Sequence, residues 1–192
     1  MRTMKYFTIG LLAMGLTACG GGADDSPGGP QKDPHHMEAA EMASRIHVME
    51  DTLFAKPYFD RQGAGALLDV YKTFAKTYPV DTMAPEFLFR AAGVAKGLSD
   101  PQGSLLLYGR IIKDYPNWKR IADAYYMKAF TLDNDLGSKG EAKTAYEEVI
   151  QRFPDHRFAD DARAMIDNLQ YTDEELIERF KKMNENSSGD AL

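Results

Sequence analysis

Apolar residues recur at helical spacing through most of the chain after residue 37. The clearest examples are three segments that each end in an aromatic residue and a proline, with the prolines 37 and 38 residues apart. Their matched positions are Tyr71, Tyr108 and Tyr146, then Phe74, Ile111 and Val149, and then Tyr78, Tyr115 and Phe153. Spacings of three, four and seven residues place these side chains on one face of a helix. Each segment is therefore predicted to be an amphipathic helix that a proline ends.

A second apolar-periodic segment follows each proline, so the repeated unit is predicted to be a helical hairpin. Two further helices flank the repeats: one ends before Lys56-Pro57, and the other begins at a capping box, Thr172 to Glu175. The expected pairs are 38–54 with 62–78, 83–98 with 101–115, 119–134 with 138–153, and 156–169 with 172–185. No segment shows sustained strand-like alternation. We expect an all-α fold, a right-handed superhelical stack of about four hairpins.

The N-terminus has the pattern of a secretion signal. Arg2 and Lys5 precede an uncharged apolar stretch that ends at Leu16, about half the roughly 20 residues that a membrane-spanning helix needs. The following segment, Leu16-Thr17-Ala18-Cys19, resembles the lipobox of bacterial lipoproteins. This resemblance implies cleavage before Cys19, a diacylglycerol on its thiol and an acyl group on its new amine. The alternative is an ordinary secretion signal with a chance cysteine.

The remaining domain boundaries follow from composition. Residues 1–18 are the expected signal peptide, 19–36 a lipidated flexible tether rich in glycine and proline, 37–186 the helical domain, and 187–192 a disordered tail. Asp24-Asp25 is either a solvating pair or a signal for export to the cell surface. We expect a lipid anchor in the outer membrane, on the periplasmic side rather than at the cell surface.

Charge limits the partners. Removal of residues 1–18 takes away Arg2 and Lys5 and no acid, which leaves 21 basic and 29 acidic residues and a formal charge of −8. An acidic chain without a basic cluster does not fit nucleic acid, whose affinity depends on neutralised phosphates. Because anionic lipids would not attract it either, the lipid on Cys19 is expected to provide the membrane attachment. Cys19 is the single cysteine, so disulfides are excluded.

Candidate catalytic or metal-binding residues are few. His47 and Asp51 share the i, i+4 spacing of two metal ligands, but we expect a solvated surface pair. His35-His36 lies in the tether, where metal binding would cost ordering entropy. The acidic run from Asp133 to Asp135 lacks the glycine and glutamate positions of a calcium loop and is expected to be a turn. We expect no catalytic residue, no metal, no cofactor beyond the covalent lipid, and no small-molecule substrate.

The hairpin pattern resembles the tetratricopeptide repeat. The family positions fall on Leu88, Ala91, Ala92, Ala95, Ser104, Tyr108 and Ile111 in one repeat, and on Tyr126, Ala129, Phe130, Asp133, Ala142, Tyr146 and Val149 in the next. Phe130 and Asp133 depart from the family pattern, and the period exceeds 34 residues. The sequences of residues 107–116 and 135–156 are similar to the repeats of envelope lipoproteins related to BamD and to the Tol-Pal protein YbgF. An N-terminal lipid favours resemblance to the BamD group, because YbgF-like proteins are soluble.

This resemblance implies a groove, lined by the first helix of each hairpin, that binds a segment of another protein. The groove positions fall on Glu86, Phe89, Lys96, Met127, Thr131 and Asn134. The alternative is a merely solvated face. The expected function is a lipid-anchored scaffold that binds other envelope proteins in outer-membrane protein assembly or export.

Two other functions stay open at this point. A glycan- or cell-wall-binding lipoprotein would need exposed aromatic rings, for which Trp118 and Phe89 are the candidates. A hydrolase would need a clustered pair of acids.

Overall fold

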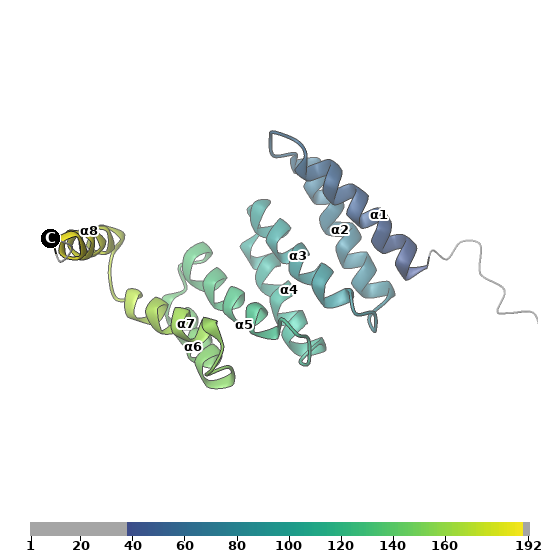
Figure 1. Cartoon of the computed structure of the whole chain (residues 1–192). Coiled ribbons are helices and arrows are strands. Elements are labelled where there is room, and N and C mark those ends of the chain that lie inside the picture. The colour runs from purple at the N-terminus through teal and green to yellow at the C-terminus, as the bar shows by residue number, and fades with distance from the viewer. Residues whose placement is uncertain (1–37, 190–192) are drawn as a thin grey trace, which may run out of the picture. The chain divides into compact units, whose positions relative to one another are not determined.

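The computed structural model describes residues 38–189. These residues form helices and the loops that connect them (Figure 1). The elements are α1 (Ala39–Phe54), α2 (Arg61–Thr77), α3 (Ala84–Gly97), α4 (Pro101–Asp114), α5 (Ile121–Phe130), the π-helical turn η1 (Thr131–Asp135), α6 (Lys139–Arg152), α7 (Arg157–Asn168) and α8 (Asp173–Gly189). The prediction of an all-α fold of hairpins is confirmed. The expected signal peptide, Cys19 and the tether lie outside the described residues.

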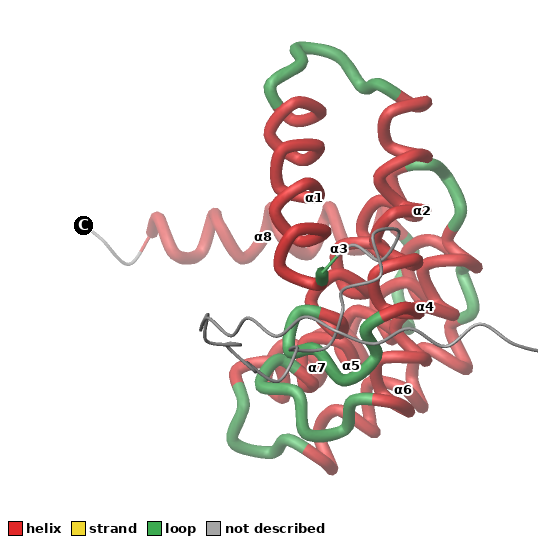
Figure 2. The backbone as a smooth tube through the Cα atoms, turned by 90° about the vertical axis from the view of Figure 1, so that its right-hand side faces the viewer, coloured by secondary structure: helices red, strands yellow, loops and turns green. Residues whose placement is uncertain are grey.

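Successive helices from α1 to α7 pack side by side, and α5 also packs against α7 (Figure 2). The hairpins are α1 with α2, α3 with α4, and α5 with α6. We call α1, α3, α5 and α7 the first helices and α2, α4 and α6 the second helices. The described part of the chain contains no helix long and apolar enough to cross a membrane.

The core lies between the hairpins and consists of the residues that repeat in the sequence. Tyr71, Tyr108 and Tyr146 are 1%, 2% and 0% exposed. Small side chains allow the helices to approach each other: Ser104 and Ala142, at equivalent places near the starts of α4 and α6, are fully buried. The repeated positions therefore hold the hairpins together by close packing.

Two of the second helices begin with the same cap. Asp60 accepts a hydrogen bond from the Gly63 amide at 2.9 Å, and Asp100 accepts one from the Gly103 amide at 2.8 Å. The cap carboxylate occupies the space that a side chain would need, since a Cβ on Gly103 would lie 2.1 Å from Asp100 Oδ2. An Asp-x-x-Gly start thus satisfies an unpaired amide of each helix.

The first helix of the third hairpin does not end as expected. A helix over 119–134 is predicted, but the regular α-helix stops at Phe130 and continues as η1. The Leu136 amide donates to the Thr131 carbonyl at 3.1 Å, which is the i to i−5 bond of a π turn. Gly137, at φ 64°, then ends the element in the left-handed region. The acidic run from Asp133 to Asp135, predicted to be a turn, therefore lies entirely in this π-helical turn.

The fourth predicted hairpin is not closed. The capping box of α8 is confirmed: the Thr172 amide donates to Glu175 at 2.8 Å, and the Glu175 amide donates to Thr172 Oγ1 at 3.3 Å. However, α8 makes at most marginal contact with the other described helices. The physical reason is that the free face of α7 is polar, with exposed residues Arg157, Asp160, Asp161, Arg163 and Asp167. Helix α8 also continues to Gly189, so residues 187–189 are helical and not part of a disordered tail.

Candidate partner-binding surface

A chain of alternating acids and bases crosses the first helices of all three hairpins. Arg90 Nη1 of α3 donates to both carboxylate oxygens of Glu50 in α1, at 2.7 and 2.9 Å. On its other side, Arg90 Nε donates to Glu86 at 3.2 Å. Arg120, the residue directly before α5, donates to Glu86 at 3.0 and 3.1 Å and to Asp123 at 2.7 Å. We call these five residues the ion-pair ladder.

The α1 end of the ladder is buried. The Glu50 side chain is 9% exposed, and besides Arg90 it accepts a hydrogen bond from the Tyr71 hydroxyl and lies 2.8 Å from His47 Nδ1. Burial alone would raise the pKa of Glu50, but the hydrogen bonds from Tyr71, Arg90 and His47 outweigh it and hold that pKa below its ordinary value. The same burial, together with the Glu50 charge, raises the pKa of Tyr71. Glu50 is therefore an ionised anchor of the ladder.

The α5 end of the ladder is aromatic. The Arg120 guanidinium lies 4.5 Å from the ring centre of Phe89 and 5.5 Å from that of Trp118. Phe89 also contacts Tyr108 of α4, with 5.5 Å between ring centres. Arg120 thus holds a cation over two partly buried rings while it bridges Glu86 and Asp123.

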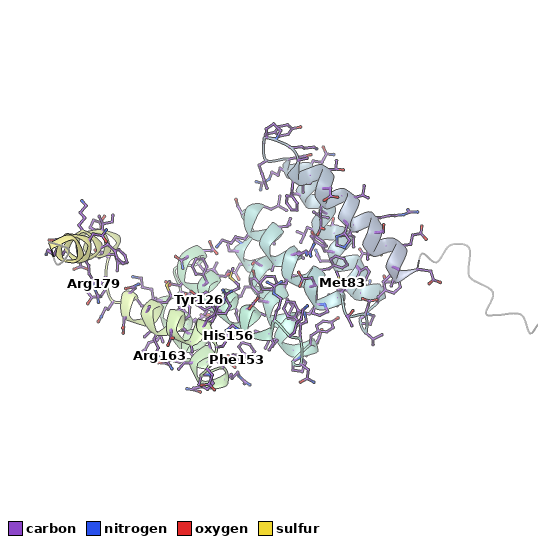
Figure 3. The ribbon with its side chains drawn as sticks, viewed as in Figure 1. Met83, Tyr126, Phe153, His156, Arg163 and Arg179 are labelled. Atoms are coloured by element: carbon purple, nitrogen blue, oxygen red, sulfur yellow. The ribbon has the colours of Figure 1, made fainter. Side chains whose placement is uncertain are left out.

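Two hollows flank Arg90. The first has a volume of about 1010 Å³ and lies between the turns that precede α3 and α5; we call it the loop hollow. Met83, labelled in Figure 3 at the turn before α3, lines it. Its other wall includes Trp118, Arg120 and Pro116. Residues of the ladder and of its aromatic end therefore line the loop hollow.

The second hollow has a volume of about 840 Å³ and lies between the C-terminal halves of α1 and α3; we call it the α1–α3 hollow. Gly93 and Gly97 of α3 are on one side of it, and Phe54, Tyr58 and Phe59 of α1 and the following loop are on the other. These three rings are 67%, 65% and 61% exposed. The two hollows therefore recess the surface on both sides of Arg90.

The six predicted groove residues have different surroundings in the structure. Glu86 and Phe89 belong to the ladder region. Lys96 pairs with Asp135 at 2.9 Å and lies 4.6 Å from the Phe130 ring centre, farther along α3. Of the others, Met127 packs against the core, and Asn134 is exposed and donates to the Phe130 carbonyl at 3.4 Å.

For Thr131 the groove prediction is wrong. Its side chain is 0% exposed, and Thr131 Oγ1 donates to the Met127 carbonyl at 2.8 Å. A residue enclosed in this way cannot contact a partner without local unfolding. The groove prediction continues the α-helical repeat of the hairpin through this position, but Thr131 is the first residue of the π turn.

Three residues of this surface, Glu50, Arg90 and Arg120, were missed by sequence reasoning. The sequence gives a weak indication of two of the ion pairs, because Glu86 and Arg90 are four residues apart and Arg120 and Asp123 are three apart. The bond between Glu50 and Arg90 joins residues 40 apart, and no local pattern indicates it.

The acids and the histidine of this surface are paired with neighbouring side chains. His47 pairs with Glu50 and not with Asp51, the partner expected from sequence. Among residues 38–189, no group of three or more His, Cys, Asp or Glu side chains is placed to hold a metal ion. The acids of the ladder are each bridged by arginine, which suits a fixed charged surface.

Residues 123–156 match the family model of the tetratricopeptide repeat. This segment comprises nearly all of α5, then η1 and α6, and it ends at the turn before α7. No curated protein matches the chain. Because the neighbouring hairpins repeat the same arrangement, the match supports a tetratricopeptide-repeat protein. Domains of this kind generally mediate protein–protein interactions, and their fold is typically that of a non-enzymatic scaffold.

Proposed function

We propose that this protein is a lipid-anchored scaffold of the bacterial envelope, which binds a segment of another envelope protein in outer-membrane protein assembly or export. The observation that carries the binding role is the ion-pair ladder beside the loop hollow. The proposed anchor is Cys19, and the proposed place is the periplasmic side of the outer membrane. The resemblance to BamD-like envelope lipoproteins supports this assignment.

The loop hollow offers the contacts that a protein segment needs. Arg120 and Trp118 form a rigid cation and ring at its wall, and such residues dominate the energy of protein interfaces. The ladder fixes Arg120 from two sides, so little side-chain entropy would be lost on binding. The backbone turn around Pro79 and the one around Pro116 form the opposite edges of the hollow.

Glycan binding is less well supported. It requires aromatic rings with an accessible flat face, and Trp118 and Phe89 are the rings predicted for that role. Both are partly buried, and they pack against each other with 5.6 Å between ring centres while Arg120 covers them. This arrangement fits a protein contact better than a sugar platform.

The test is a pull-down from detergent-solubilised envelopes with the lipidated protein, comparing wild type with Trp118→Ala plus Arg120→Ala. We expect the variant to lose the bound proteins. Arg152→Ala is the matched control, because Arg152 pairs with Glu148 and lies 5.3 Å from the Tyr125 ring, but on the second helix of its hairpin. Phe89 is left unchanged because its contact with Tyr108 belongs to the core.

The same bound proteins with wild type and the double variant would show that the loop hollow is not the binding site. Capture of purified peptidoglycan, lost in the double variant, would favour the glycan-binding alternative.

The anchor has its own test. Cys19→Ser should move the protein from the outer-membrane fraction to the soluble periplasmic fraction, and metabolic labelling with palmitate should disappear. An unlabelled wild-type protein would contradict the proposed lipidation.

A further inference from the structure

We propose that α8 of one molecule docks into the α1–α3 hollow of a second copy of this chain. This interaction uses the hollow on the other side of Arg90 from the proposed partner site, and it does not depend on the proposed function. It pairs two apolar surfaces that remain open within one chain.

The first surface is the apolar stripe of α8. Leu176, Ile177 and Phe180 lie at spacings of one, three and four residues, which places them on one side of the helix. Ile177 is 55% exposed and Phe180 is 52% exposed. Helix α8 packs on no other described helix beyond a marginal contact, and the free face of α7 is polar. The stripe therefore lacks an apolar partner among the described residues.

The second surface is the α1–α3 hollow. Gly93 and Gly97, one turn apart on α3, form the part of its floor that has no side chains, beside Leu53, Ala64 and Val94. A Cβ on Gly93 would meet nothing within 4 Å, whereas one on Gly97 would touch the Phe59 ring at 3.6 Å. The exposed rings of Phe54, Tyr58 and Phe59 form the rim. A glycine floor with an aromatic rim fits the side of an amphipathic helix, because the two backbones can approach closely.

Charges at the two surfaces are complementary. Asp51 lines the hollow, is exposed, and forms no ion pair with another described residue. Lys181 is likewise exposed and unpaired within the described part of the chain. It lies one turn after Ile177, at the edge of the apolar stripe. Docking of the stripe in the hollow places a lysine near an aspartate that needs a partner.

Chain length favours a second copy over the same molecule. The five Cα–Cα steps from Asn168 to Asp173 span at most about 18 Å. Helix α7 packs next to α5, α3 lies one hairpin beyond, and the hollow lies between α3 and α1, so it is more than two interaxial spacings from α7, at least about 20 Å. Because the two surfaces are different, the contact is head-to-tail and can continue from molecule to molecule.

A single short helix buries less than a standard interface, so we expect weak association with a Kd of about 10–100 µM. The experiment is sedimentation equilibrium of the full mature chain as Cys19→Ser, over a concentration series that brackets this range. Wild type should associate with concentration, and Phe180→Asp should weaken association at least about tenfold.

Gly93→Leu is the variant that tests the hollow. It fills the floor where space is open, and leucine is a better helix former than glycine, so the fold should be retained. Gly109→Leu is the matched control, because a Cβ on this glycine of α4 also meets nothing within 4 Å. We expect Gly93→Leu to be monomeric and Gly109→Leu to associate like wild type.

A charge exchange identifies the orientation. Asp51→Lys and Lys181→Asp should each weaken self-association. A mixture of the two variants should recover it, because the introduced lysine of one variant meets the introduced aspartate of the other only across an intermolecular contact. A monomeric wild type over the whole series, or association of Gly93→Leu at the wild-type level, would overturn the proposal. Neither result would affect the pull-down that tests the loop hollow.

Discussion

Removal of the Arg90 charge is the most informative perturbation of the ion-pair ladder. Arg90→Met keeps most of the aliphatic stem but removes both hydrogen bonds to Glu50 and the one to Glu86. Glu86 retains Arg120, whereas Glu50 retains Tyr71 and His47 but loses its cation. The variant therefore leaves a buried carboxylate only partly compensated.

The expected cost follows from burial. Leaving a buried charge without its partner costs about 3–5 kcal/mol when nothing replaces that partner. The Arg90 side chain is 37% exposed, and solvent screens part of the interaction; two hydrogen-bonding groups also remain around Glu50. We therefore expect a loss of about 1–2 kcal/mol in the free energy of unfolding at pH 7.

The loss should depend on pH. In the wild type the pKa of Glu50 is below its ordinary value of 4.5, so the ionised carboxylate stabilises the fold above that pH, and the stabilisation is lost as the pH falls through the folded pKa. Without Arg90, fewer interactions oppose the effect of burial, which raises the pKa of Glu50, so this pKa is higher in the variant than in the wild type. The difference between wild type and variant should thus be largest at pH 7 and shrink as the pH falls through the variant's folded pKa.

Urea denaturation followed by circular dichroism at pH 7 and near pH 4 measures both effects. The same substitution in a Glu50→Gln background completes a double-mutant cycle, in which Arg90→Met should cost less because no charge is left unpaired. An equal cost in both backgrounds and at both pH values would refute the assignment of Glu50 as an ionised anchor.

Two further predictions concern stability. Tyr108→Ala should cost about 3–5 kcal/mol by opening a cavity between hairpins, since Tyr108 is 2% exposed; an unchanged thermal melt would contradict the repeat register. Asp100→Ala should cost about 1 kcal/mol because the Gly103 amide at the start of α4 loses its acceptor, and Asp114→Ala, at the other end of the same helix, serves as a control in urea denaturation.

The bounds of the helices follow closely from the sequence. The predicted helix over 101–115 is α4 at Pro101–Asp114, because a cap, a periodic apolar face and a closing proline define both of its ends. The π turn after Phe130 does not follow, since apolar periodicity cannot distinguish a wider turn within a helix from its regular continuation. The predicted pairing of α8 with α7 is wrong for another reason. The sequence pattern shows that α8 is amphipathic, but it does not show that the apolar face of α7 is already buried against α5 and α6.

The candidate surface was harder to predict because it depends on the angle between hairpins. Matching single positions to the repeat indicates Glu86 and Phe89. It does not indicate Arg90, although Arg90 follows Phe89 directly and links Glu86 to Glu50. The exposed rings of Phe54, Tyr58 and Phe59 are visible as aromatic residues in the sequence, yet only the structure shows that they border a hollow.

The ladder also has a consequence for the order in which the array unfolds. In a stack of repeats, stability is the sum of each hairpin and its interfaces with its neighbours, so partial unfolding starts where the interfaces are weakest. The ladder adds charge bridges from α1 to α5, while α7 is held largely by apolar contacts such as the stacking of Phe158 on Tyr126 at 4.4 Å. Amide hydrogen exchange should therefore proceed from the C-terminal end, with α8 and α7 opening before the first hairpins. With the proposed anchor at Cys19, the hairpins nearer the anchor along the chain would then keep their shape while the C-terminal helices open and close.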